Sequence, residues 1–478
     1  MQAMHDGNAL VGIALFGWIP SVVLLFALLP PRRAAIVGFL GGWMFLPCAG
    51  YEIKFFPEYN KTTAICAGIL VATLVFDTGR ITRFRFHWLD LFPIMYCIVP
   101  FFSSLSNGLG AYDGFSAAAN SMMIWLTPYL IGRLYFTDLE GVRELIMGLF
   151  IAGLVYLPLC LWEIRMSPSL HFFTYGYNQV RFFQTVRAGG GYRPMVFMGN
   201  GLMLSLFMGF TALSGFGLWL SKTKRNFLGL PLWMFVVALG LTTLFCKSAG
   251  ASILFLGGIL SLLVIRYLKT SLPITILACT AIAYIVIRGS GLWSGMELVD
   301  MASVLGPARE ESLRVRIENE TALAERARGR LLLGWGGWGD SRIKDEHGRD
   351  ISITDGFWII VFGTRGVLGV IGFVGTILGP ALLLVYRIRG RCLAHPAIVP
   401  AAIAALILCL WMVDSIPNAM FNPIYLVTAG GLAALKEVKV TQRQNVKIRP
   451  TRLGAPTVFA GEKGPERKHG VNLPVSDR

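Results

Sequence analysis

Charged side chains are scarce in this sequence of 478 residues: they form 15% of it, against 55% for hydrophobic residues. A soluble protein of this length carries about a quarter charged residues. The composition therefore excludes a soluble multidomain enzyme, and the hydrophobic content excludes a disordered chain. The 8 cysteines fall mostly in or beside apolar runs, so we expect neither disulfides nor a Cys-rich metal site.

Alternation of apolar and polar residues is also missing, which excludes a transmembrane β-barrel. Instead, apolar runs recur along the chain, and many are long enough to cross a hydrocarbon core of ~30 Å with about 20 residues of helix. The sequence thus predicts an all-α fold, a polytopic transmembrane helical bundle of about 12–13 spans. The predicted spans are residues 8–30, 34–50, 62–76, 88–105, 115–131, 142–162, 194–220, 227–245, 249–265, 272–287, 366–386, 396–413 and 421–435.

Lysine and arginine are absent from residues 1–8. The first apolar run therefore lacks the basic flank of a signal peptide, and we expect it to be retained as a span. The alternative is a twelve-span arrangement in which the first helix is only half inserted.

The net charge is +16, but the basic residues form no aromatic–basic patch, so no nucleic-acid partner is expected. Lysine and arginine gather in every second loop. By the positive-inside rule these loops and the C-terminus are cytoplasmic, and the N-terminus is outside. The basic loops contain residues 32–33, 80–85, 133–143, 222–225, 266–269 and 387–391.

Three regions follow from this pattern: a transmembrane domain over residues 1–435, a large outer loop inserted at 289–355, and a tail at 436–478. The tail is polar, basic and rich in proline and glycine, which predicts a disordered cytoplasmic extension. The spans themselves contain almost no acids, whereas an ion-coupled transporter is expected to carry them mid-membrane. No clear internal repeat indicates an inverted-repeat transporter either.

An outer loop at 163–193 is unusually rich in arginine and contains one acid, Glu163. The positive-inside bias works against arginine in such a loop, so these residues need a reason to be there. An anionic ligand is one reason, because a guanidinium grips phosphate with two parallel hydrogen bonds. Lipid headgroups or local ion pairs are the alternative.

The large outer loop contains a predicted helix at 307–333. Glu310 and Arg314, and likewise Arg316 and Glu320, are four residues apart, which predicts ion pairs along this helix. A Gly-Trp-rich segment at 329–339 then predicts a flexible aromatic loop, whose tryptophans suit sugar rings or the headgroup belt.

Asp355 lies where the chain returns to the membrane. Residues 357–364 are predicted to form an interfacial segment, with the next span starting at Gly366. Asp355 and Arg365 are then both expected near the outer interface. Asp355 also suits an N-cap position, which is the structural alternative to a chemical role.

Four segments carry a family likeness, and they occur in the family's order. Two precede the large loop: Arg187-Ala-Gly-Gly-Gly-Tyr-Arg193-Pro before a span, and Leu244-Phe-Cys-Lys-Ser-Ala-Gly-Ala between two spans. Within the loop, Arg316 begins a helical stretch that is followed by Gly334-Trp-Gly336. Finally, Asp355-Gly is followed by nine residues and then Gly366-Val-Leu-Gly. Over residues 187–369 the chain resembles the bacterial O-antigen ligase/polymerase family of membrane glycosyltransferases.

Two positions differ from that family's pattern. Ala249 stands where arginine is usual, and Asp355 stands where the ligases have histidine. An aspartate is compatible with general-base work, and this difference slightly favours a polymerase over a ligase. The alternatives from other classes are a transporter or flippase of lipid-linked glycans and a non-catalytic scaffold of polysaccharide export.

The resemblance implies an oligosaccharide donor on polyprenyl pyrophosphate and an acceptor glycan, used on the periplasmic side of the bacterial inner membrane. Membrane lipid and other polysaccharide assembly proteins are the further partners it implies. No cluster of metal ligands is visible, and we expect no cofactor. The candidate catalytic residues are Asp355, as general base, and Arg316. The candidate substrate-binding residues are Arg187, Arg193, Arg365, Trp335 and Trp338.

Overall fold

The chain folds mostly into helices, as shown by a computed structural model that describes residues 2–3, 7–53, 57–187, 190–303, 306–337, 339–435, 438–440 and 446–448. The first half contains α1 (Ala9–Leu28), α2 (Pro31–Phe45), α3 (Lys61–Phe76), α4 (Thr78–Thr82), α5 (Leu91–Ser106), α6 (Ala111–Ser121), a π-helix (Met122–Leu126), α7 (Thr127–Tyr135), α8 (Leu139–Met166), α9 (Leu170–Tyr175) and α10 (Gly201–Leu220).

The second half contains α11 (Leu232–Phe245), α12 (Ala249–Leu268), α13 (Leu272–Ser290), α14 (Met296–Ala302), α15 (Pro307–Arg328), α16 (Phe357–Arg387), α17 (Gly390–Leu393), α18 (Val399–Asp414) and α19 (Ile424–Ala434). The strands are short: β1 (Gln2–Ala3), β2 (Gly50–Glu52) and β3 (Tyr59–Asn60) form one sheet, and β4 (Asn226–Phe227) with β5 (Leu230–Pro231) a second. In the tail, β6 (Val438–Val440) pairs with β7 (Val446–Ile448), and the rest of residues 436–478 lies outside the described residues.

Seven helical segments of the described chain are long and apolar enough to cross a membrane, and the predicted multi-pass helical bundle is thereby confirmed. They are α1, α8, α10, α12, α13, α16 and the segment Trp88–Ser106. Four shorter apolar helices, α3, α11, α18 and α19, lie among them. At 20 residues, α1 is long enough for a full span. The exact count of 12–13 spans stays a prediction.

The centre of the bundle is formed by α10, α18 and α19, which are apolar on every face and almost wholly buried. By contrast, only 22% of the apolar stretch of α1 is buried, so this helix lies on the outside of the bundle. The α7 and α19 helices touch backbone to backbone, because a Cβ on Gly132 would collide with the Val427 carbonyl oxygen. Small residues at such crossings are typical of membrane helices.

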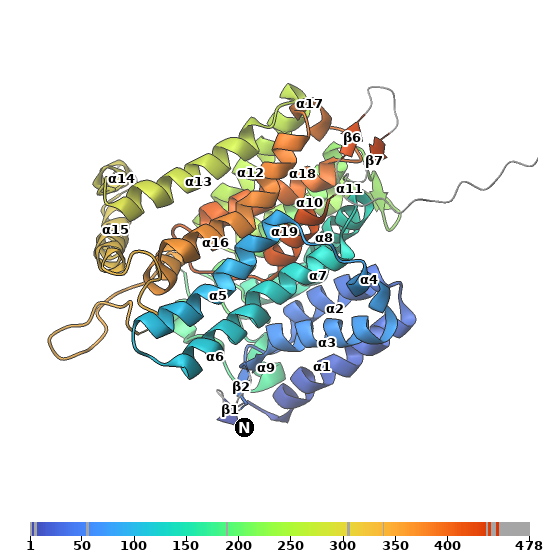
Figure 1. Cartoon of the computed structure of the whole chain (residues 1–478). Helices are drawn as coiled ribbons and strands as arrows, with labels where there is room; N and C mark the ends of the chain where they lie inside the picture. Colours follow the sequence, from blue (N-terminus) through green and yellow to red (C-terminus); the bar gives the residue numbers. More distant parts are fainter. Residues whose placement is uncertain are drawn as a thin grey trace, which may run out of the picture.

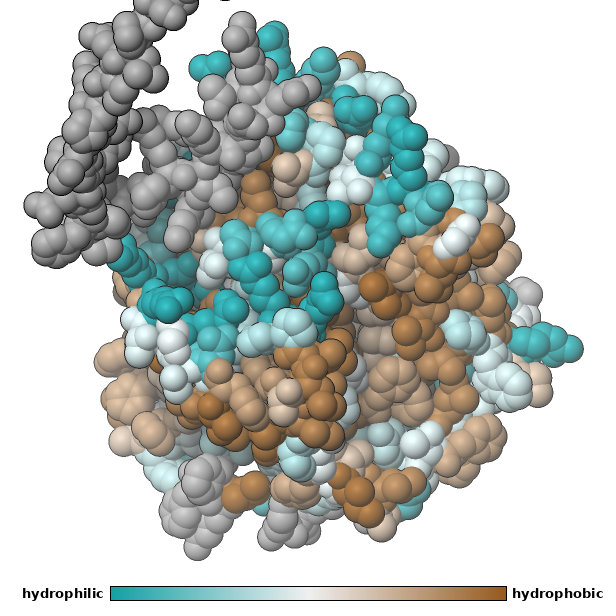
Figure 2. Space-filling model, turned by 90° about the vertical axis from the view of Figure 1, so that its right-hand side faces the viewer, coloured by the Kyte–Doolittle hydropathy of each residue, from teal (hydrophilic) through white to brown (hydrophobic). Residues whose placement is uncertain are grey.

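The bundle has two distinct ends (Figure 1). The loop end carries residues 289–356, and hydrogen bonds there join distant turns, such as that from Ser103 Oγ to the Gly334 carbonyl (3.3 Å). The basic end carries α4, α17 and the predicted basic loops, joined by contacts such as that of Arg133 Nη2 with the Arg85 carbonyl (2.7 Å). Hydrophilic side chains gather over the middle and top of this end, with hydrophobic surface below (Figure 2).

The chain after the large loop breaks where the sequence predicted a boundary. α16 (Phe357–Arg387) consists of two helical segments that meet at a kink at Gly366, where φ is 62° and ψ is −162°. Residues 357–364 therefore form a helical segment of their own before the kink. The placement of that segment at the membrane interface stays a prediction.

Residues 331–336 fill this kink. The amide of Val367 donates a hydrogen bond to the Leu331 carbonyl (2.8 Å). In the other direction, the amide of Trp335 donates to the Gly363 carbonyl (2.9 Å). The segment predicted to be a flexible loop is therefore pinned to α16. Irregular backbone at this depth is tolerated where protein groups satisfy its polar atoms.

We expect Gly366→Ala to destabilise the protein, because this φ and ψ combination is accessible almost only to glycine. A Cβ would also lie 2.5 Å from the Leu332 carbonyl carbon. The cost should be about 2 kcal/mol or more, measured as a lower thermal midpoint in detergent. Gly257→Ala in α12, where a Cβ meets nothing within 4 Å, is the control and should leave the midpoint equal or higher. Equal midpoints for the two variants would contradict the expectation.

Candidate functional site

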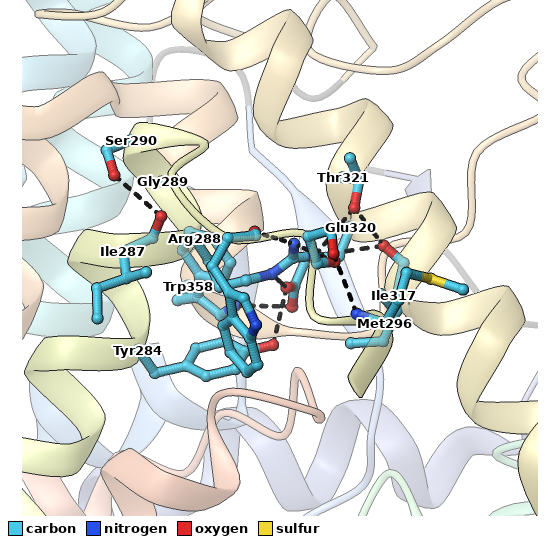
Figure 3. A network of polar contacts seen from close by, with 12 residues as sticks. Tyr284, Ile287, Arg288, Gly289, Ser290, Met296, Ile317, Glu320, Thr321 and Trp358 are labelled. Carbon is cyan, nitrogen blue, oxygen red and sulfur yellow. Dashed lines mark hydrogen bonds and ion pairs between the residues drawn. The ribbon is translucent and has the colours of Figure 1, made fainter. Parts of the chain in front are cut away.

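One buried ion pair fixes the position of α15 at the loop end (Figure 3). Arg288, at the end of α13, is 3% exposed and donates from Nε to Glu320 Oε1 on α15 (2.7 Å). Glu320 also accepts hydrogen bonds from the Tyr284 hydroxyl (2.8 Å) and from Nε1 of Trp358 on α16 (3.1 Å). The other nitrogens of Arg288 donate to α15 and to the turn before α14. Three helices are thus held by one carboxylate.

This register brings Arg316 and Asp355 together. Arg316 lies one helical turn before Glu320 on α15, and Asp355 lies three residues before Trp358 in the sequence. The Nε atom of Arg316 is 3.3 Å from Oδ2 of Asp355. Asn319 supports the same register, because its Oδ1 accepts a hydrogen bond from the backbone amide of Ile353 (3.0 Å). The two candidate catalytic residues, 39 positions apart in sequence, therefore touch, with 43% of Arg316 and 36% of Asp355 side-chain surface exposed.

Two expectations for these residues are wrong. Arg316 does not pair with Glu320, because Glu320 is turned inward to Arg288; the predicted pair of Arg314 with Glu310 is present (2.7 Å). Asp355 does not cap α16, because the N-cap residue is Gly356 and no side chain caps the helix. The carboxylate is left for Arg316 and for solvent.

The backbone beside Asp355 is fixed from the opposite side by the turn that follows α18. The Phe357 amide donates to the Ser415 carbonyl (2.9 Å), and a Cβ on Gly356 would collide with the Ile416 carbonyl oxygen. Asp355 thus lies between α15 and the α18–α19 turn, on backbone that is held from both sides.

A second group surrounds a cavity of about 230 Å³ at the loop end, beside the N-terminus of α10. Arg187 and Arg193 both line it, so two of the candidate substrate-binding residues are brought together. Their Nε atoms are buried and have no hydrogen-bond partner among the described residues. Arg193 Nη2 donates to the Lys247 carbonyl (2.9 Å), which brings a third cation close to the pair. The remaining lining residues are Val180, Gln184, Thr185, Met195, Asn200, Gly201 and Leu202.

Electrostatics make this cavity ready for an anion. Burial, together with the charge of Arg187, lowers the pKa of Arg193 to about 10. Burial also lowers the pKa of Arg187. Both shifts mean that positive charge is held there at a cost, and a bound anion would offset it. The N-terminus of α10 adds its partial positive charge, and no acid is among the lining residues.

Glu163 shapes this cavity without pairing with any arginine. Its side chain is 1% exposed and accepts the amides of Met195 (2.8 Å), Val196 (2.7 Å) and Leu170 (3.1 Å). Val196 is held at a φ of 52°, which a β-branched residue rarely adopts. The acid that sequence reasoning weighed against the arginines therefore fixes the backbone that carries Arg193.

Two of the remaining candidates, Trp335 and Arg365, lie at the kink of α16. Trp335 stacks beneath Arg326 (4.4 Å) and Arg330 (5.4 Å) and donates its indole N–H to the Arg326 carbonyl (2.8 Å), so intramolecular contacts occupy the ring. Trp338 lies outside the described residues. Arg365 is eight residues into α16, directly before the kink at Gly366, and its guanidinium is 3.8 Å from the centre of the Tyr96 ring on α5.

The predicted residues therefore form separate groups. Asp355 joins Arg316, Arg187 joins Arg193, and Arg365 lies apart within the bundle. The sequence analysis missed Arg288 and the actual roles of Glu320 and Glu163, because their partners are distant in the chain. In the part of the chain that the structure describes, no cluster of three His, Cys, Asp or Glu residues could hold a metal ion.

Replacing Arg193 with methionine should leave the protein folded and remove its response to pyrophosphate. Because burial of this charge is unfavourable, the thermal midpoint of Arg193→Met should equal or exceed that of the unchanged chain. Pyrophosphate should raise the thermal midpoint of the unchanged protein, because a free pyrophosphate concentration of 100 times Kd adds about 2.7 kcal/mol to the free energy of unfolding. The midpoint of the variant should not change.

Arg181→Met, an exposed arginine of the same loop, is the control and should respond like the unchanged chain. A full response from Arg193→Met would show that the cavity is not the anion site.

Comparison with models of known protein families finds no match to this chain. Comparison with curated proteins finds no match either.

Proposed function

We propose that this chain is a membrane glycosyltransferase that moves an oligosaccharide from polyprenyl pyrophosphate to an acceptor glycan. The observation that carries the proposal is the contact of Asp355 with Arg316 at 3.3 Å, on the same end of the bundle as the arginine-lined cavity. A half-exposed carboxylate and a cationic cavity are the two groups that such a reaction needs.

The chemistry assigns a role to each group. An acceptor hydroxyl must lose a proton as it attacks the sugar, and Asp355 takes that proton, which contributes about 10²–10⁴-fold. Negative charge grows on the departing pyrophosphate as the glycosidic bond breaks. Arg187 and Arg193 stabilise that charge more strongly than the charge of the bound donor. Arg316 orients the carboxylate.

The charge pattern supports an orientation. By the positive-inside rule, the proposal has the basic end and the C-terminus in the cytoplasm, and the loop end and the reaction on the periplasmic side of the bacterial inner membrane. The large loop is then the periplasmic loop, next to lipid-linked donor, acceptor glycan and other assembly proteins. Asp355 in the position of the ligase histidine favours a polymerase over a ligase.

The test is a strain that lacks this gene, analysed for the length and sidedness of its lipid-linked glycans. Single repeat units on the periplasmic face, restored to long chains by the gene, are the expected result for a polymerase. Long unattached chains on that face would make the protein a ligase. Repeat units trapped on the cytoplasmic face would overturn the transferase and indicate a flippase.

A further inference from the structure

Two cysteines meet at the loop end of the bundle. Cys160 lies on α8, Cys246 directly follows α11, and both side chains are 0% exposed. Their thiols are hydrogen-bonded to each other. Both are present as thiols in the structure. Two buried sulfur atoms from distant parts of the chain are therefore in contact, and the proposed reaction uses neither of them.

The packing of α8 against α11 explains this contact. Each helix follows a basic loop and ends beside the arginine-lined cavity, so the two run parallel from the basic end to the loop end. They already meet at Gly153 and Leu239, because a Cβ on Gly153 would lie 3.2 Å from the Leu239 side chain. Cys160 and Cys246 each come seven residues later, which is nearly two turns of 3.6 residues and keeps the same faces together.

Each cysteine is next to a residue that holds Arg193. Cys246 precedes Lys247, whose carbonyl accepts a hydrogen bond from Arg193 Nη2 (2.9 Å). Cys160 is three residues before Glu163, whose carboxylate accepts two backbone amides just after Arg193 (2.8 and 2.7 Å). A bond between the two sulfur atoms would therefore join the two supports of this arginine.

We propose that Cys160 and Cys246 form a disulfide in the cell, which links α8 to the turn after α11. The sulfur atoms need only approach from hydrogen-bond contact to a bond of about 2 Å. The proposal rests on the proposed orientation, because disulfides form and persist on the periplasmic side of the membrane. The alternative is a pair of thiols that fills space as small apolar groups.

The oxidant is a protein disulfide of the same compartment. One cysteine, as thiolate, attacks that disulfide and forms a mixed disulfide, which releases one thiol of the oxidant. The second cysteine then attacks the mixed disulfide, so the Cys160–Cys246 bond forms and the oxidant leaves as a dithiol. Two electrons and two protons pass to the oxidant. Because both sulfur atoms are buried in the finished bundle, the exchange takes place during assembly, before the pair is covered.

The test traps the thiols in cells with acid, alkylates the denatured full-length chain with N-ethylmaleimide, and analyses its peptides by mass spectrometry without reduction. We expect a linked peptide that contains Cys160 and Cys246 and is two hydrogens lighter than the sum of its parts. In Cys160→Ala the link should be absent and Cys246 should be alkylated. Alkylation of both cysteines in the unchanged chain would overturn the disulfide.

A second arm separates the pairing from the orientation. The purified, reduced protein is treated with diamide, which oxidises neighbouring thiols. A link that forms with diamide and is missing in cells would overturn the native disulfide and count against the proposed orientation. A link that forms under neither condition would overturn the pairing alone, because the glycans of the strain that lacks the gene test the reaction and its sidedness separately.

The disulfide should also stabilise the protein, because it closes a long loop, residues 160–246. Cys160→Ala/Cys246→Ala should unfold about 5 °C below Cys66→Ala/Cys97→Ala, which removes two thiols that are equally 0% exposed. The difference should vanish when the unchanged chain and both variants are prepared and kept reduced. A difference that persists under reduction would assign the loss to packing and contradict a stabilising cross-link.

Discussion

Asp355→Asn is expected to lower the rate of glycan transfer by about 10²–10⁴-fold, because asparagine keeps the shape of the side chain and cannot accept the proton of the acceptor hydroxyl. Folding should be unaffected, since the Asp355 side chain is 36% exposed and caps no helix. The measurement is polymer formation by purified protein from lipid-linked repeat units, together with the thermal midpoint.

The chain offers a close control in Asp350→Asn. Asp350 is 42% exposed, pairs with Arg342 (2.9 Å), and has a pKa lowered by hydrogen bonds from Ser352. It is therefore a second carboxylate paired with arginine in the same loop. It should retain full activity. Equal activity of the two variants would remove Asp355 as the base.

The role of Arg316 can be separated from its charge by a double-mutant cycle. If Arg316 acts by orienting Asp355, then Arg316→Met should slow the reaction in the unchanged chain and have little further effect in Asp355→Asn. Additive losses would instead indicate that Arg316 contacts the substrate independently of Asp355.

Glu320→Ala is expected to destabilise the loop end by about 3–5 kcal/mol, because it leaves the Arg288 charge buried and uncompensated. The Tyr284 hydroxyl and the Trp358 indole lose their acceptor as well. The measurements are the thermal midpoint in detergent and the rate at which a protease cuts residues 289–356.

Glu310→Ala removes an exposed ion pair of the same helix and should have little effect on either measurement. Replacing the buried pair with apolar residues, Arg288→Met with Glu320→Leu, should recover part of the loss, because neither charge is then stranded. A Glu320→Ala protein as stable as Glu310→Ala would show that the network does not hold α15.

The sequence predicted the helices well where a signal was local. Apolar runs located the spans, and alternating charge located the basic end, because both signals lie within one segment. The local glycine signal also located the break in α16 at Gly366. The segment that fills this break, residues 331–336, lies elsewhere in the chain, so its contacts left no local signal.

The candidate site was predictable only in part. Asp355 and Arg316 were singled out by the family likeness, and the geometry that joins them was not visible in the sequence. Arg316 has Glu320 four residues away as an obvious local partner. The competing partner of Glu320, Arg288, is 32 residues away, and only the fold shows that it wins. Glu163 was misjudged similarly, because a carboxylate that accepts backbone amides leaves no pattern in the sequence.

The hydrogen bonds that hold the loop end have a consequence for biogenesis. The loop end takes hydrogen-bond partners from helices that are synthesised after it: Trp358 and Val367 on α16, and Ser415 after α18. While the ribosome is still making these helices, the loop end can contact only earlier elements, such as α13 through Arg288 and Glu320. The contacts around Asp355 are therefore completed late, when the last helices enter the membrane. A chain truncated before α18 would carry every candidate catalytic residue and lack the Ser415 contact that holds the backbone next to Asp355.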